Sequence, residues 1–221
     1  SGIVHLNSGL YDKYGGDILG NYKTRDFRIF IGVDYDHENN PGFMSLENHT
    51  YNNDTTFYLL MDGSRKRKDR DYNVRAGFEW YMSEKSTISL SGRYGGGIDN
   101  DIANNGYNEW NPFNQIRNQY SNEQDNERSR NFFALNSNFT YEFDSAKHRL
   151  DADIMLFRFN GGEDNVNMLY NDNGTIRSGQ KSLEGGPAEG FNYRVNYVNS
   201  FSELINIEMG AQGRVRNSNE W

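Results

Sequence analysis

The chain has 221 residues and a formal net charge of -8; 35% of its residues are hydrophobic and 14% are aromatic. The acidic balance excludes a protein that neutralises nucleic-acid phosphates, because that function requires a basic surface. The aromatic content argues against a disordered chain, which would lack this apolar surface. Because no cysteine is present, disulfides and cysteine-ligated metals are excluded as well.

Apolar and polar residues alternate with a period of two, which is typical of strands that bury one face. Beginning with a glycine-rich segment, the alternation predicts about eight strands, near residues 14–22, 27–35, 72–80, 88–94, 133–143, 150–156, 191–197 and 205–211. In the second of these, Phe27 and Ile29 point one way and Arg28 points the other. The phase changes at Phe157 and Phe159, which predicts a β-bulge there.

The connections alternate between short and long. Short turns are predicted near residues 24–26, 83–86, 144–147 and 200–203. Polar segments near 38–68, 98–127 and 160–189 are expected to be long loops, in which Thr56 to Met61 is a strand extension. Short turns at one end of a sheet and long loops at the other are the layout of an outer-membrane β-barrel. No segment has the roughly 20 apolar residues of a transmembrane helix, so a membrane would be crossed as a closed barrel.

Alternation alone does not identify what covers the apolar face, since a soluble β-sandwich has the same pattern. Aromatic residues near the predicted strand ends favour the interfacial girdles of a membrane barrel; they are Tyr22, Tyr35, Tyr72, Trp80, Tyr81, Tyr94, Tyr141 and Phe143. The opposite face carries charges of both signs, including Arg75, Arg93 and Asp153. These charges fit a wetted barrel lumen and an ordinary solvated face equally well.

Two hairpins carry a resemblance to a known family. The first is YNVRAGFEWYMSEKSTISLSG at residues 72–92, and the second joins a glycine-led strand, the turn Lys23-Thr24-Arg25-Asp26 and another strand within residues 16–35. Both resemble the strand–turn–strand hairpins in the barrel domain of TonB-dependent receptor-like outer-membrane proteins. The opening residues 1–7 are similar to the last plug strand of that family, although a barrel strand would have much the same sequence pattern.

The resemblance implies an all-β fold, an antiparallel up-and-down meander that is part of a transmembrane outer-membrane β-barrel. Residues 1–9 are then either the end of a plug or the first strand, and residues 10–221 are a barrel-wall segment of about eight strands. Family members have more strands and a complete plug, so the chain is expected to be a fragment of a longer protein.

The same resemblance implies a protein of the cell outer membrane that takes up a bulky nutrient and is not an enzyme. Its partners would be outer-membrane lipid, a large soluble ligand such as a glycan, peptide or metal chelate, and a periplasmic energy-coupling protein reached through the plug. No cofactor is expected. Two alternatives stay open: a soluble extracellular β-sandwich that binds glycan, and a structural outer-membrane barrel that transports nothing.

Few side chains suggest specific chemistry. The four histidines, at positions 5, 37, 49 and 148, lack the spacing of a metal site. Aromatic residues in the second long polar segment are predicted to contact the ligand; they are Tyr107, Trp110, Phe113 and Tyr120. The basic run at residues 65–68 is either a contact for lipopolysaccharide phosphates or a solvated segment. The run Asn171-Asp172-Asn173-Gly174 resembles part of a calcium loop and is predicted to be a turn.

Overall fold

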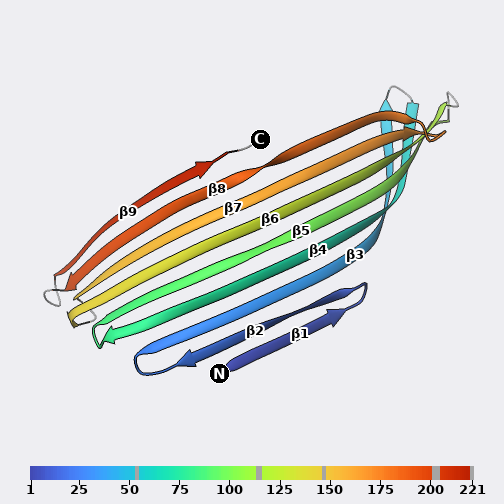
Figure 1. Cartoon of the computed structure of the whole chain (residues 1–221). Helices are drawn as coiled ribbons and strands as arrows, with labels where there is room; N and C mark the ends of the chain where they lie inside the picture. The colour runs from blue at the N-terminus through green and yellow to red at the C-terminus, as the bar shows by residue number, and fades with distance from the viewer. Residues whose placement is uncertain (53–54, 113–115, 146–147, 201–204, 220–221) are drawn as a thin grey trace.

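The computed structural model describes residues 1–52, 55–112, 116–145, 148–200 and 205–219. These residues form one antiparallel sheet in which each strand pairs with its neighbours in the sequence (Figure 1). The strands are β1 (Gly2–Gly9), β2 (Lys13–Lys23), β3 (Phe27–Asn52), β4 (Thr55–Ser83), β5 (Ser86–Asn111), β6 (Ile116–Ser145), β7 (His148–Asn171), β8 (Ile176–Ser200) and β9 (Asn206–Ser218). The predicted all-β, up-and-down meander is confirmed.

The described residues of the three polar segments expected as long loops are strands instead, apart from residue 112 and the turn at residues 172–175. Glu38 pairs with Asp69 across β3 and β4, Asp99 with Arg128 across β5 and β6, and corresponding pairs extend β7 and β8. Strands β3 to β8 are therefore 24 to 30 residues long. Backbone hydrogen bonds hold these extensions whatever the side chains are, and polar residues on both faces remove the alternation that would have marked them as strands.

The first nine residues contain a strand of the same sheet. β1 runs antiparallel to β2, from the pair Gly2 and Gly20 to the pair Gly9 and Lys13. Tyr11 and Asp12 adopt positive φ angles of 64° and 59° in the turn between them. With β1 included the sheet has nine strands, one more than the alternation alone predicted.

The β-bulge predicted at Phe157 and Phe159 is wrong. The register of β7 with both neighbours is unbroken there, and the irregularities lie elsewhere, between Glu142 and Ser145 and between Leu169 and Tyr170. Phe157 points to the polar face, where its ring lies over Gly190 on the next strand and leaves no space for a Cβ atom. An aromatic ring that packs over a cross-strand glycine therefore breaks the pattern without any change in the backbone.

One face of the sheet is an apolar belt. Residues that lie opposite each other across antiparallel strands point to the same face, so the register joins the apolar stripes of separate strands into one surface. This belt consists of Val4, Ile18, Ile29, Ile31, Val33, Val74, Phe78, Ile88, Leu90, Leu135, Phe139, Leu150, Ile154, Leu156, Phe191, Val195, Ile207 and Met209. Ile31 is 56% exposed and Ile154 46%, whereas Asn73 on the opposite face is only 7% exposed.

Two rows of aromatic residues border the apolar belt. The row on the side of the long extensions contains Tyr14, Tyr35, Tyr72, Tyr94 and Phe133, and the row near the short turns contains Tyr22, Phe27, Trp80, Tyr141 and Tyr197. The rings of Tyr72 and Tyr94 are 6.1 Å apart, as are those of Tyr22 and Phe27. Tyr35, Tyr72 and Tyr94 lie in mid-strand rather than at strand ends, because the strands continue beyond them. Tyr81 belongs to neither row, since it points to the polar face and donates a hydrogen bond to Glu79.

Residues 171–175 form a tight turn, as predicted. The Gly174 amide donates to the Asn171 carbonyl, and the Thr175 amide and hydroxyl both donate to Oδ1 of Asn173. Gly174 has a φ of 76°, a conformation that residues with a Cβ atom rarely adopt.

The close approach of Phe30 to Gly77 generates a prediction about stability. These residues are opposite each other on the polar face, and a Cβ atom on Gly77 would overlap the Phe30 ring. We expect Gly77→Ala to lower the free energy of unfolding by about 1–3 kcal/mol, because overpacking forces the ring out of place. Urea unfolding followed by tryptophan fluorescence measures this change.

Two further variants control the test of that contact. Gly92→Ala on the adjacent strand should be tolerated, since its Cβ would meet Leu135 at an ordinary 3.8 Å. The double variant Phe30→Ala/Gly77→Ala should be more stable than the sum of the two single changes predicts. If the losses in the free energy of unfolding are additive, the contact between Phe30 and Gly77 is contradicted.

Candidate ligand-binding surface

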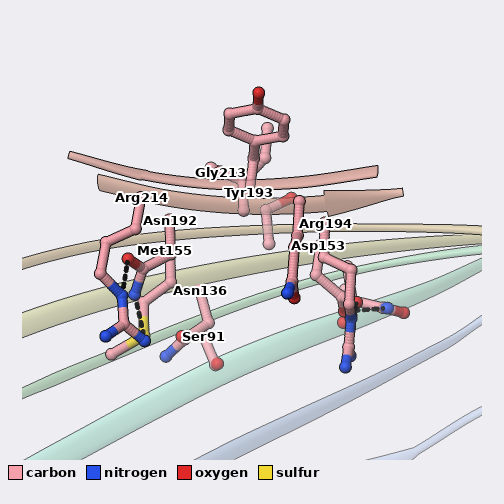
Figure 2. Close-up of a pocket in the computed structure, with 14 residues that line it drawn as sticks. Ser91, Asn136, Asp153, Met155, Asn192, Tyr193, Arg194, Gly213 and Arg214 are labelled. Atoms are coloured by element: carbon pink, nitrogen blue, oxygen red, sulfur yellow. Dashed lines mark hydrogen bonds and ion pairs between the residues drawn. The ribbon is translucent and has the colours of Figure 1, made fainter. Parts of the chain in front are cut away.

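The polar face of the sheet has a hollow of about 840 Å³ across β5 to β9. Its polar lining includes Ser89, Ser91, Asn136, Asn138, Asp153, Asn192, Arg194, Gln212 and Arg214. Figure 2 shows Arg194, Asn192 and Arg214 pointing to one side of the sheet and Tyr193 pointing to the other. The alternation of β8 thus supplies polar groups to the hollow and apolar groups to the belt.

Asp153 is the centre of one hydrogen-bonded cluster in this hollow. Its Oδ2 accepts hydrogen bonds from Arg194, at 3.0 Å from Nε and 2.8 Å from Nη2. Its Oδ1 accepts from the Asn138 amide at 2.7 Å. The carboxylate therefore fixes the guanidinium of Arg194, whose side chain remains 57% exposed and available to a ligand.

Arg214 is held by a different set of contacts. Its Nε donates to Oδ1 of Asn192 at 3.1 Å, and the Asn192 amide contacts the Met155 sulfur at 3.8 Å. No acidic side chain pairs with Arg214 among the residues that the structure describes. The hollow thus presents guanidinium, amide and hydroxyl groups, which suit a polar ligand that carries carboxylate, amide or hydroxyl groups.

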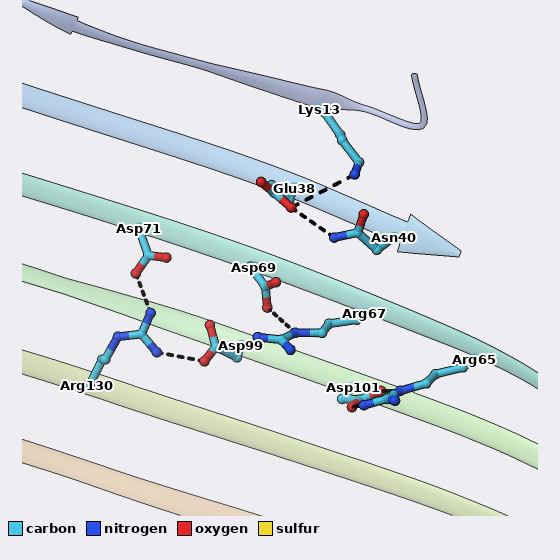
Figure 3. Close-up of polar contacts among 10 residues, drawn as sticks. All are labelled: Lys13, Glu38, Asn40, Arg65, Arg67, Asp69, Asp71, Asp99, Asp101 and Arg130. Carbon is cyan, nitrogen blue, oxygen red and sulfur yellow. Dashed lines mark hydrogen bonds and ion pairs between the residues drawn. The ribbon is translucent and has the colours of Figure 1, made fainter. Parts of the chain in front are cut away.

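A network of ion pairs continues along the same face into the long extensions (Figure 3). Arg130 lies between two carboxylates, 2.6 Å from Asp71 and 2.7 Å from Asp99. Arg65 pairs with Asp101, with 2.8 Å between Nε and Oδ1. Arg128 pairs with Glu163 at 2.9 Å on the next strand. These cross-strand pairs link β4, β5, β6 and β7 where no apolar layer holds them together.

Three of the four predicted ligand-contact residues lie in the described part of the chain, and the structure does not bring all three together. Tyr107 and Tyr120 are opposite each other on the polar face, and their rings stack at 4.8 Å. Trp110 points to the other face, where it stacks on Tyr58 at 5.3 Å. Phe113 lies outside the described residues.

Tyr120 has the more constrained environment of the stacked pair. Its hydroxyl donates to Glu109 at 2.7 Å, and the Arg177 guanidinium lies 5.9 Å from the centre of its ring. Burial, followed by the hydrogen bond to Glu109, raises the pKa of Tyr120 to about 12. Tyr107 and Tyr120 also border a smaller hollow of about 360 Å³ with Asn171 and Asp172. Their contact with a ligand remains a prediction.

The hollow on β5 to β9 was not predicted from the sequence. Its charged residues were recognised as one stripe of each strand, but five strands must be in register before the stripes form a single surface. A regular occurrence of Ser, Asn and Gln between the apolar positions was the available signal. No three acidic or histidine side chains are grouped as a metal site in residues that the structure describes, and no membrane-spanning helix is found among them.

Comparisons with known proteins identify similar sheets at low sequence identity. No family model and no curated protein matches the sequence. The structure is similar to the ferric preacinetobactin receptor BauA from Acinetobacter baumannii, with 8% identity and a TM-score of 0.42 over 99% of this chain and 41% of that one. It is also similar to the RagAB peptide importer in its 'closed-closed' state, with 11% identity and a TM-score of 0.44 over 94% of this chain and 32% of that one. The chain therefore spans a third to two fifths of those proteins.

The ion pair between Arg65 and Asp101 predicts a pH dependence. The hydrogen bond from Arg65 holds the pKa of Asp101 below its ordinary value. A lowered carboxyl pKa stabilises the fold above the ordinary Asp pKa, and this stabilisation is lost as the pH falls through the lowered value. We expect Arg65→Gln to raise the pKa of Asp101, which carboxyl NMR measures. Because Arg67 is a smaller influence on Asp101, Arg67→Gln should raise that pKa less. If both variants raise the pKa of Asp101 equally, the specific pairing of Arg65 with Asp101 is contradicted.

Proposed function

We propose that this chain is part of the wall of an outer-membrane β-barrel, of the TonB-dependent receptor type, that imports a bulky polar solute. The single observation that carries the proposal is the apolar belt, which is exposed on one face of the sheet while polar side chains fill the other. In water such a surface would cost free energy over its whole area, so it requires an apolar partner. In the proposed barrel, the hydrocarbon of the membrane covers the belt.

The dimensions of the belt support this assignment. Tyr72 and Trp80 mark its two borders on β4, and eight residues of strand span about 26 Å. At the tilt of about 40° found in membrane barrels, this corresponds to roughly 20 Å of membrane thickness, comparable with the apolar band of such proteins. The aromatic rows then lie at the two interfaces, where Tyr and Trp are enriched.

The single described sheet argues against a soluble sandwich. Sandwich strands bury their apolar stripes between two stacked sheets, whereas the described residues form one sheet with its apolar face exposed. A non-transporting structural barrel shares the belt but has no need of an open polar hollow. The hollow, with its exposed guanidinium groups, therefore favours a wall that contacts a passing solute.

In the proposed barrel the polar face lines the lumen and performs no chemistry. The belt anchors the wall in lipid, and the ion pairs of the extensions keep the hairpins rigid outside the membrane. Uptake would be driven by a periplasmic energy-coupling protein that acts on a plug inside the lumen. The hollow suits the amide and carboxylate groups of a peptide, the hydroxyl groups of a glycan and the anionic groups of a metal chelate alike.

Two tryptophan substitutions at adjacent positions of β5 test this proposal in the full-length protein. Ser91 lines the hollow, whereas Leu90 lies in the belt. We expect Ser91→Trp to reduce uptake several-fold, because the indole obstructs the solute, and Leu90→Trp to change it little, because an indole is tolerated in lipid. Uptake is measured in cells with a fluorescent peptide mixture, a fluorescent oligosaccharide mixture and a ferric chelate.

The outcomes separate transport from scaffolding. Loss of uptake in Leu90→Trp but not in Ser91→Trp would contradict the assignment of the faces. If the wild-type protein takes up none of the three probes, import of these solute classes is contradicted and the structural barrel is favoured. Extraction of both variants from the outer membrane in folded form controls for misfolding.

A further inference from the structure

The basic run at residues 65–68 is divided between the two faces of β4. Its register with β3 and β5 is regular from Tyr58 to Tyr81, so successive side chains point to opposite faces. Arg65 and Arg67 share the polar face with Asp69 and Asp101. Lys66 and Lys68, followed by Arg70, share the face of the apolar belt.

The inward members of the run are neutralised by acidic residues. Arg65 pairs with Asp101, and Arg67 pairs with Asp69 at 2.9 Å, both on the polar face (Figure 3). These two arginines thus belong to the ion-pair network, and acidic side chains of the protein neutralise their charge.

The outward members form a column of three cations, which we call the outer cationic column: Lys66, Lys68 and Arg70. None of them forms an ion pair with another described residue. The residues opposite them on the adjacent strands are uncharged side chains and one histidine, namely His37, Asn39, Pro41, Ile98, Asn100 and Ile102. Lys66 and Arg70 are exposed and Lys68 is half-buried.

Acidic residues on the same face do not cancel the column. Asp62 lies four residues beyond Lys66 on β4, about 13 Å along the strand. Asp125 and Glu127 lie on β6, two strands away from β4, which is about 10 Å. No ion pair joins these acids to the column among the described residues, so the three cations are available to anions outside the protein.

The position of the column relative to the belt indicates which anion it meets. Tyr72 belongs to the aromatic row at the border of the belt, and Arg70 is the next residue outward on the same face. Arg70, Lys68 and Lys66 are then about 7, 13 and 20 Å beyond Tyr72 along the strand. If the belt lies in hydrocarbon, this interval crosses the layer of lipid headgroups.

We propose that the outer cationic column binds the phosphate groups of a phosphorylated glycolipid in the outer leaflet. The proposal rests on the proposed function, since the column faces headgroups only if the belt faces hydrocarbon. The long extensions assign this end of the sheet to the outside, as in outer-membrane barrels generally. Lys and Arg side chains reach along the surface to phosphate oxygens as charged hydrogen-bond donors.

The test uses the purified full-length protein and bisphosphorylated lipid A as the probe. Lipid A in mixed micelles is titrated against the wild type and against the variant Lys66→Gln/Lys68→Gln/Arg70→Gln. We expect the variant to bind on the order of tenfold more weakly or worse, since each cation near anionic headgroups contributes to the attraction. Raised salt should weaken wild-type binding and narrow the difference.

A matched control removes three cations from the polar face of the same region. The variant Arg65→Gln/Arg67→Gln/Arg128→Gln makes the same change in net charge but should bind lipid A nearly as the wild type does. Lys66→Arg/Lys68→Arg/Arg70→Lys should retain binding. Phosphatidylglycerol micelles and inorganic phosphate distinguish the glycolipid from other phosphate sources, and both should bind more weakly than lipid A.

Three results would overturn the proposal: an unchanged affinity in the outward variant, an equal loss in the inward control, or equal binding of phosphatidylglycerol and lipid A. These failures are distinct from failure of the proposed function. If the wild-type protein requires detergent and reconstitutes into bilayers but does not prefer lipid A, only the proposed binding of glycolipid by the outer cationic column is contradicted. A protein that is monodisperse without any amphiphile contradicts the membrane wall itself.

Discussion

The regular register of the antiparallel ladder is the constraint on which the rest of the structure depends. Each strand carries its apolar residues at alternate positions, and a slip of one residue would move a whole stripe to the other face. Because the register is regular through the middle of the sheet, nine separate stripes coincide in one belt. The polar hollow has the same origin, since it is the opposite half of the same alternation.

The apolar belt and the polar face have opposite solvation requirements, and this difference connects the fold to its function. A belt with Ile31, Leu90 and Ile154 about half exposed requires an apolar surrounding. Buried side chains on the polar face instead form cross-strand hydrogen bonds, such as the one from the Asn73 amide to Asp34 at 2.6 Å. A wall between hydrocarbon and water meets both requirements. The strand edges at β1 and β9 would be paired with further strands in the proposed barrel, as lipid demands.

The sequence predicted the strands within the belt and did not predict how far they extend. Alternation was visible where one face is apolar, as at Phe27 and Ile29. It disappeared where both faces are polar, as from Ser121 to Glu127. The β-bulge predicted at Phe157 was wrong for a local reason, because the Phe157 ring packs over Gly190 on the polar face. Tyr107 and Tyr120 were chosen as candidates from the aromatic composition of their segment alone. Trp110 points to the other face of β5 because it is three residues from Tyr107, and only the strand pairing shows that this segment is a strand.

Spin labelling along β5 distinguishes a belt that lies in hydrocarbon from a belt that another protein layer covers. The chain has no cysteine, so single cysteines can be introduced at each position from 87 to 94 in the full-length protein reconstituted in bilayers. If the belt lies in hydrocarbon, labels at even positions should be accessible to the oxygen dissolved there. Labels at odd positions should be accessible to a water-soluble relaxation reagent. Even-numbered positions that are shielded from both reagents would instead indicate a second protein layer over the belt, and would contradict the membrane wall.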